Sequence, residues 1–124
     1  MLDYLAAVNE RMALSERMAV FHQKYDLLIT PTLPLTAFDT NREVPRDWPN
    51  TRWPTWTPFT YPFNMTGQPA LSVPLGRAGD GLPMGLQIVG RRFQDELVLK
   101  AGHLFERARP FTERPDLALA GMEA

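Results

Sequence analysis

The chain has 124 residues, which allows one modest domain with a single core. Its net charge is −1, with acidic and basic residues spread along the chain, so neither a nucleic acid nor an anionic membrane surface is expected as a partner. It has no Cys, which excludes a disulfide framework, a thiolate nucleophile and a Cys-ligated metal.

Targeting and metal-binding signals are also absent from the sequence. The N-terminus carries no basic segment followed by an apolar one, and no run of about 18 apolar residues occurs. We therefore expect a cytoplasmic protein. His22 and His103 are the only histidines, and with scattered carboxylates they do not have the spacing of a metal site, so we expect surface or packing roles, no metal and no cofactor.

Residues 1–25 predict an amphipathic helix. Apolar side chains recur at helical spacing and are interrupted by Arg11: Tyr4, Ala7, Leu14, Met18, Phe21 and Tyr25. A core-facing helix is the favoured interpretation, and a groove-binding helix is the alternative. Residues 26–30 turn apolar and β-branched, and Pro31 ends the run. This predicts a short strand covered on both faces.

Residues 31–62 predict a long loop. They hold more than half of the 12 prolines and all three tryptophans. Proline removes amide donors and fixes φ, which excludes a regular helix or a central strand. A loop this long and aromatic indicates a pocket wall or a lid. The alternative is a polyproline ligand, because residues 31–34 fit a P-x-x-P pattern.

Residues 70–89 predict an antiparallel strand pair. Apolar runs at 70–75 and 84–89 flank Gly79-Asp80-Gly81, whose glycines supply the positive φ angles of a reversal. Upstream, Asn64 and Gly67 suit the first and fourth positions of a β-turn. Residues 94–108 predict a second helix that Pro110 ends, and residues 111–124 a loosely held tail.

Three ordered motifs now indicate a family. They are YDLLITPTLP at 25–34, PFTYPFNMTGQPALSVPLG at 58–76, and GLPMGLQIVGRRFQDE at 81–96. Together they resemble the C-terminal part of enzymes of the amidase signature family. The resemblance implies an α/β fold: a fragment of an α/β/α sandwich with a mixed β-sheet, two main helices and a long Pro/Trp-rich loop, all in one partial domain over residues 1–124.

The resemblance also implies a chemistry that this chain lacks. Family members hydrolyse or transfer amides with a Ser nucleophile, a second Ser in a cis peptide and a Lys base, all upstream of the matched part. The only serines here are Ser15 and Ser72, and the only lysines Lys24 and Lys100. Ser15 and Lys24 lie nine residues apart on one predicted helix, over ~13 Å. We expect no catalytic residue in this chain and no activity of the chain alone.

The resemblance implies that this segment forms part of the wall of a substrate-binding site. Trp56, Thr57 and Tyr61 are the candidate substrate-binding residues, and simple packing of the loop is the alternative. Thr57 stands where glutamine-using amidotransferase A subunits carry an Asp that holds the substrate's amino group. A neutral Thr cannot pair with an ammonium, so the position favours a general amidase for neutral or aromatic amides.

Two hypotheses follow from these features. The chain is a C-terminal segment of an amidase, inactive alone, or it is a non-catalytic subunit or binding module that docks to a partner. The resemblance also leaves open a subunit-A-like fragment of a glutamyl-tRNA amidotransferase. Strands suited to cover on both faces would otherwise expose apolar surface and open sheet edges. The expected partners are a complementary N-terminal amidase chain or a second copy of this chain, with a small amide substrate only in the complete enzyme.

Overall fold

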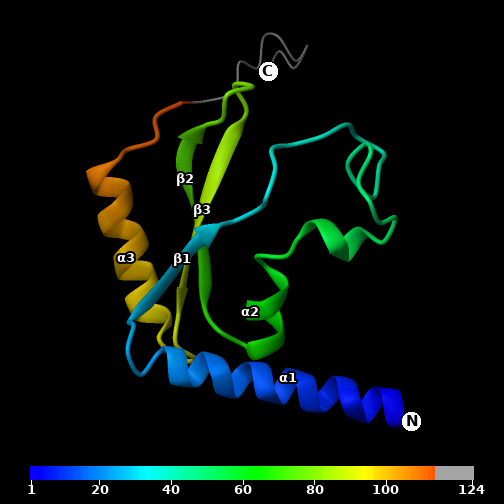
Figure 1. The fold of residues 1–124 in the computed structure, drawn as a ribbon. Coiled ribbons are helices and arrows are strands. Elements are labelled where there is room, and N and C mark those ends of the chain that lie inside the picture. The colour runs from blue at the N-terminus through cyan, green and yellow to red at the C-terminus, as the bar shows by residue number, and fades with distance from the viewer. Residues whose placement is uncertain (114–124) are drawn as a thin grey trace, which may run out of the picture.

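The computed structural model describes residues 1–113. Its elements are α1 (Leu2–Phe21), β1 (Leu27–Pro31), a 3₁₀ turn (Trp53–Trp56), α2 (Tyr61–Thr66), β2 (Ala70–Arg77), β3 (Pro83–Gly90) and α3 (Asp95–Ala108). The strands form one sheet in the order β1-β3-β2, with α3 beside it and α1 crossing one end (Figure 1). The predicted α/β class is confirmed. Most of the predicted tail lies outside the described residues.

The sheet is antiparallel among the described strands, whereas the resemblance implies a mixed sheet. β2 and β3 form the predicted hairpin, and β1 pairs with the other side of β3, with Ile29 opposite Ile88. Because both outer strands run against β3, they are parallel to each other. They do not form a pair, because β3 lies between them.

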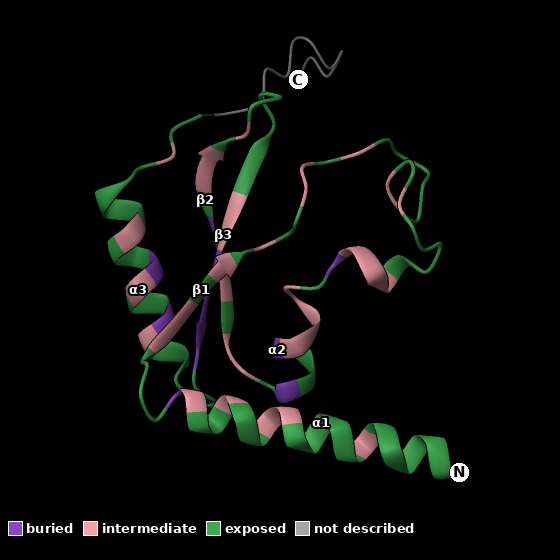
Figure 2. Cartoon of the chain, in the orientation of Figure 1, coloured by how far each residue is buried: buried purple, intermediate pink, exposed green. Residues whose placement is uncertain are grey.

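Helix α3 covers one face of the sheet, over β2 and β3. Val98 is buried there, and Gly102 lets the helix approach so closely that a Cβ would lie 2.2 Å from Leu71 Cδ2. Buried residues gather at this contact and along the middle of the sheet (Figure 2). β1 lies outside the area that α3 covers. Ile29 is 60% exposed, so the prediction that this strand is covered on both faces is wrong within the described chain.

Helix α1 is shorter and less packed than predicted. It ends at Phe21, where the amides of Gln23 and Lys24 donate to carbonyls three residues back. None of its residues is fully buried, and Leu2 is 82% exposed. Its contact is with α2, where Arg11 Nε donates to the Met65 carbonyl over 2.9 Å. The N-terminal half extends beyond the other described elements (Figure 1).

Residues 61–66 form a helix where the sequence predicts a β-turn over 64–67. Asn64 lies inside α2, and Gly67 ends the helix with φ 66° and an amide that donates to the Phe63 carbonyl. Gly67 is therefore a left-handed C-terminal cap. Pro62 stands within the first two helical positions, where a missing N–H costs no hydrogen bond. The same holds for Pro54 in the 3₁₀ turn, so the predicted loop contains short helical segments.

Hydrogen bonds tie the start of the long loop to the hairpin. The Thr32 amide donates to the Gly85 carbonyl over 3.0 Å, and the Thr36 hydroxyl donates to Asp80 Oδ2 over 2.6 Å. The Asp80 carboxylate also accepts from the Leu82 amide. These hydrogen bonds, that of Thr36 first, hold the pKa of Asp80 below its ordinary value. The loop thus has a defined place along the sheet.

The turn between β3 and α3 contains an unusual backbone conformation. The Gln94 amide donates to the Arg91 carbonyl over 3.0 Å, which makes Phe93 the third residue of a β-turn. Phe93 has φ 65°, and its side chain is 82% exposed. A left-handed conformation is unfavourable for a residue with a bulky side chain, and Asn adopts it at lower cost.

We predict that Phe93→Asn is more stable to unfolding than Phe93→Ala by about 1 kcal/mol, because only Asn relieves the positive φ. Both variants lack the ring, so the difference between their free energies of unfolding reports the cost of the positive φ. Urea denaturation followed by circular dichroism measures it. Equal stability of the two variants would show that this turn is not strained.

The lowered pKa of Asp80 gives a second prediction. A carboxyl whose pKa is depressed by folding stabilises the fold above its unfolded pKa of about 3.9, and this contribution is lost as the pH falls through the folded pKa. Thr36→Val removes the hydroxyl and should raise the Asp80 pKa, whereas Thr36→Ser should keep it low. Carboxyl-detected NMR titration measures the midpoints. Identical midpoints in the three proteins would contradict the assigned cause.

Candidate functional site

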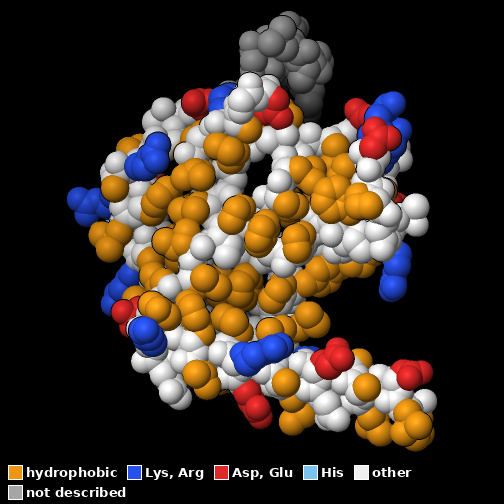
Figure 3. Space-filling view, viewed as in Figure 1, with side chains coloured by type: hydrophobic (Ala, Val, Ile, Leu, Met, Phe, Trp, Pro, Cys, Tyr) orange, Lys and Arg blue, Asp and Glu red, His pale blue; other side chains and the backbone are white. Residues whose placement is uncertain are grey.

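A groove of about 1070 Å³ lies between the sheet and the start of the long loop. Strands β1, β2 and β3 supply one side, and residues 32–38 with Trp56 and Phe59 supply the other. Hydrophobic side chains gather over the sheet and the adjoining loop (Figure 3). Within the described chain, no side chain that lines the groove is ionisable. Its chemistry suits a neutral, mainly apolar body.

A pair of hydroxyls provides polar groups inside this groove. Thr32 Oγ1 and Ser72 Oγ lie 2.7 Å apart, joining the loop to β2. Gly85 of β3 lies against both, and a Cβ at this position would be 2.8 Å from each oxygen. Glycine is therefore required for the two hydroxyls to meet. The pair can offer hydrogen bonds to a neutral group but cannot neutralise a charge.

Gln87 holds the second part of the loop against the sheet. Its side chain is 5% exposed, and its Nε2 donates to Thr30 Oγ1 over 2.9 Å and to the Phe59 carbonyl over 2.8 Å. Burying an amide costs free energy unless it is hydrogen-bonded, and both donors here are used. Sequence reasoning missed this residue. The signal that could have found it is a lone polar side chain inside the apolar run 84–89.

The three predicted substrate-binding residues lie in different surroundings. Trp56 lines the groove, with its ring edge-on to Phe38 at 5.1 Å and its Nε1 donating to a loop carbonyl. Thr57 is 8% exposed, does not line the groove, and donates its hydroxyl to the Pro54 carbonyl over 3.1 Å. Tyr61 begins α2 and lies 6.0 Å from the Trp53 ring. Their binding role stays a prediction, with Trp56 best placed for it.

Each Ser and Lys of the chain is engaged elsewhere. Ser15 donates to the Arg11 carbonyl, and Ser72 pairs with Thr32. Lys100 forms an ion pair with Glu96 at 2.7 Å, and Lys24 lies over the Tyr25 ring. An activated Ser needs a base within hydrogen-bonding reach. Across residues 1–113 no Ser bonds to a Lys, so this part of the chain holds no such pair.

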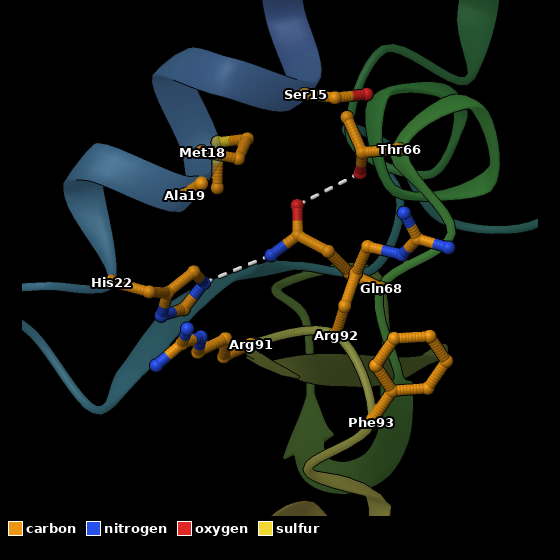
Figure 4. A pocket seen from close by; sticks show the side chains of 9 residues that line it. All are labelled: Ser15, Met18, Ala19, His22, Thr66, Gln68, Arg91, Arg92 and Phe93. Atoms are coloured by element: carbon orange, nitrogen blue, oxygen red, sulfur yellow. Dashed lines mark hydrogen bonds between the residues drawn. The ribbon is translucent and has the colours of Figure 1, made fainter.

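His22 belongs to a hydrogen-bonded network beside a second, smaller hollow (Figure 4). Gln68 Nε2 donates to the Gly90 carbonyl and lies 2.9 Å from His22 Nε2, while Gln68 Oε1 accepts from Thr66. Because the Gly90 carbonyl requires a donor, the amide nitrogen faces His22. His22 Nε2 is then the acceptor, and its Nδ1–H donates to the Tyr25 carbonyl over 3.0 Å. The network joins α1, α2 and β3, which is a structural role.

Neither a metal cluster nor a membrane span occurs among the described residues. Residues 1–113 contain no group of three or more His, Asp or Glu placed to hold a metal ion. In the same part of the chain, every helix is too short or too polar to cross a membrane.

The family model and the most similar known sequences indicate the same family. The family model described as Amidase matches residues 1–99. The chain is 40% identical over 120 residues to the A subunit of glutamyl-tRNA(Gln) amidotransferase from Rhodospirillum rubrum, covering 97% of this chain and 23% of that protein. It is 38% identical over 106 residues to an acylamidase of Rhodococcus erythropolis, covering 76% of this chain and 20% of that protein.

Solved structures agree with the sequence matches. The A subunit of glutamyl-tRNA(Gln) amidotransferase from Thermotoga maritima superposes with a TM-score of 0.77 at 35% identity, over 89% of this chain and 23% of that one. A bacterial aryl acylamidase superposes with a TM-score of 0.75 at 29% identity, over 93% and 26%. The chain thus spans about a quarter of the length of the relatives it matches. On the agreement of sequence and fold, it belongs to the amidase signature family.

Proposed function

We propose that this chain is the C-terminal portion of an amidase and contributes one wall of a site that hydrolyses neutral amides. The observation that carries the proposal is the large groove without an ionisable lining side chain, in a family member whose described residues contain no Ser–Lys pair. A wall of this kind can bind and shield a substrate. It cannot supply the nucleophile.

The catalytic groups come, in this proposal, from a complementary N-terminal polypeptide. The family resemblance assigns it a Ser nucleophile, a second Ser in a cis peptide and a Lys base. The Ser oxygen adds to the amide carbonyl as its proton passes to the base, the amine leaves with a proton, and water then hydrolyses the acyl-enzyme. This chain excludes water from one side and holds the apolar part of the substrate.

The wall favours a neutral or aromatic amide. Trp56 and Phe38 present an aromatic edge-to-face pair on the loop side of the groove. A substrate ammonium would meet no carboxylate among the lining side chains, and Thr57, where the resemblance places an Asp in amidotransferase A subunits, is neutral and bonded to Pro54. Burying an unpaired charge is strongly unfavourable. An amide with an apolar body matches these surfaces.

Open surfaces on the sheet support docking to a partner. β1 pairs with β3 on one side only, and Ile29 on this strand is 60% exposed. An edge strand with unpaired amides and an exposed apolar side chain favours association. The groove extends this surface along the loop. Association with the complementary polypeptide would cover both.

A second candidate has a specific observation in its favour. The 40% identity to one glutamyl-tRNA(Gln) amidotransferase A subunit, and the TM-score of 0.77 to another, support a fragment of such a protein. Such a fragment would be one part of an assembly of several chains, or a non-catalytic binding module within that assembly. Glutamine is its test substrate, and a neutral anilide is the test substrate of the general amidase.

We predict that the chain, purified from its own source cells under native conditions, forms a complex with an amidase polypeptide that contains the Ser–Ser–Lys residues. The complex should hydrolyse 4′-nitroacetanilide, and the chain alone should not exceed a blank. Replacing the partner's nucleophilic Ser by Ala should abolish turnover. Turnover by the chain alone, or a chain without this partner, would overturn the proposal. Hydrolysis of glutamine in place of the anilide would select the second candidate.

Within that complex, Trp56→Ala should lower kcat/KM for the anilide at least about tenfold, because loss of the half-buried aromatic side chain that lines the groove removes more than about 1.4 kcal/mol of binding. The matched control is Trp53→Ala, since Trp53 is exposed and lies outside the groove lining. Equal effects of the two substitutions would argue against the assigned wall.

A further inference from the structure

Gln87 is placed to act on the groove without lining it. In the register of the sheet it lies opposite Thr30 of β1 and Ser72 of β2, and both of these residues line the groove. Residues opposite one another in an antiparallel sheet point to the same face. Gln87 therefore projects between two lining residues, and it is itself buried and absent from the lining.

The direction of its two hydrogen bonds follows from their acceptors. The Phe59 carbonyl can only accept, so the nitrogen of the Gln87 amide faces it, over 2.8 Å. Thr30 Oγ1 donates its own hydrogen to the Pro31 carbonyl, so it accepts the other N–H of Gln87, over 2.9 Å. Both hydrogens of this nitrogen are thus used, one toward β1 and one toward the long loop.

The bond to Phe59 fixes the second half of the long loop. The middle of this loop lies away from the sheet (Figure 1). Among residues 1–113, the Gln87–Phe59 bond is the one hydrogen bond that joins the loop beyond residue 38 to a strand. Phe59 and Trp56 line the groove from the loop side. Because β1 is held by its pairing with β3, the reach of the Gln87 side chain determines how far the loop side lies from the strand side.

We propose that Gln87 is a positioning residue, which sets the width of the groove and thereby how tightly the site holds its amide substrate. An amide is required at this position. A Met fills a similar space but leaves the Phe59 carbonyl without its donor, and a Glu directs a negative oxygen toward that carbonyl oxygen. The last step, from the width of the groove to substrate affinity, rests on the function proposed above.

The first test uses the full chain without a partner and reports on the loop alone. Its probe is hydrogen exchange of the Trp56 indole N–H, which donates to the Glu43 carbonyl. Gln87→Met and Gln87→Glu should each speed this exchange at least about tenfold, because the loop opens more often from the sheet.

Gln68→Met is the matched control for the exchange measurement. It also removes a side-chain amide nitrogen with two partners, His22 and the Gly90 carbonyl, and it lies outside the groove lining. This variant should leave the exchange of the Trp56 indole unchanged. Circular dichroism verifies that each variant is folded. Unchanged exchange in a folded Gln87 variant, or an equal effect of Gln68→Met, would refute the positioning role.

A measurement on the unmodified chain serves if the Gln87 variants unfold. The side-chain N–H groups of Gln87 should exchange with solvent at least about tenfold more slowly than those of Gln23, since Gln87 is buried and bonded whereas Gln23 is exposed. Equal exchange rates of the two side chains would overturn the proposal.

The second test uses the complex with the N-terminal amidase polypeptide. Gln87→Met should raise KM for 4′-nitroacetanilide about fivefold and change kcat less than about twofold, because a displaced wall weakens the binding of substrate and transition state alike. Gln68→Met should leave KM unchanged. An unchanged KM in the Gln87 variant would contradict the role in substrate affinity. If the unmodified complex does not hydrolyse the anilide, the proposed function fails, and the exchange rates alone decide whether Gln87 positions the loop.

Discussion

Pairing of β3 on both of its sides is the constraint on which the other described elements depend. Its Val89 is completely buried, and its Gly90 carbonyl accepts from Gln68, which connects the sheet to α1 through His22. Gln87 on the same strand holds the loop. Helix α3 packs on β3 and β2. Because amides in the middle of a sheet must all be paired, a shift of β3 by one residue would misplace each of these contacts together.

Periodicity and turn chemistry predicted much of the fold. The runs at 70–75 and 84–89 lie within β2 and β3, and α3 begins at Asp95 as its acidic first turn indicates. Short helical segments were harder to recognise. Pro54 and Pro62 argue against regular structure, yet proline is well tolerated in a first helical turn. Gly67 suits both a β-turn and a helix cap, and only the packing of Phe63 and Thr66 in the core distinguishes them.

The candidate site was less accessible to sequence reasoning than the fold. Family resemblance indicated Trp56, which does line the groove, but it could not show that the neighbouring Thr57 turns its hydroxyl to Pro54. The groove brings residues 29–38 against residues 72–86, and no local pattern encodes such a distant approach. The positive φ of Phe93 could not be predicted from the sequence either. A turn that joins two fixed elements can impose an unfavourable φ on whichever residue occupies the position.

Strand order also determines when the sheet can form. β2 and β3 meet across a short turn, whereas β1 reaches β3 only after residues 32–82 have been closed into a loop. Closing a long loop costs entropy before any non-local contact is gained, so hairpin formation precedes the addition of β1. On a ribosome, β1 leaves the exit tunnel well before its partner strand exists. For that interval the β1 amides that will pair with β3 have no partner strand, which leaves this segment open to aggregation.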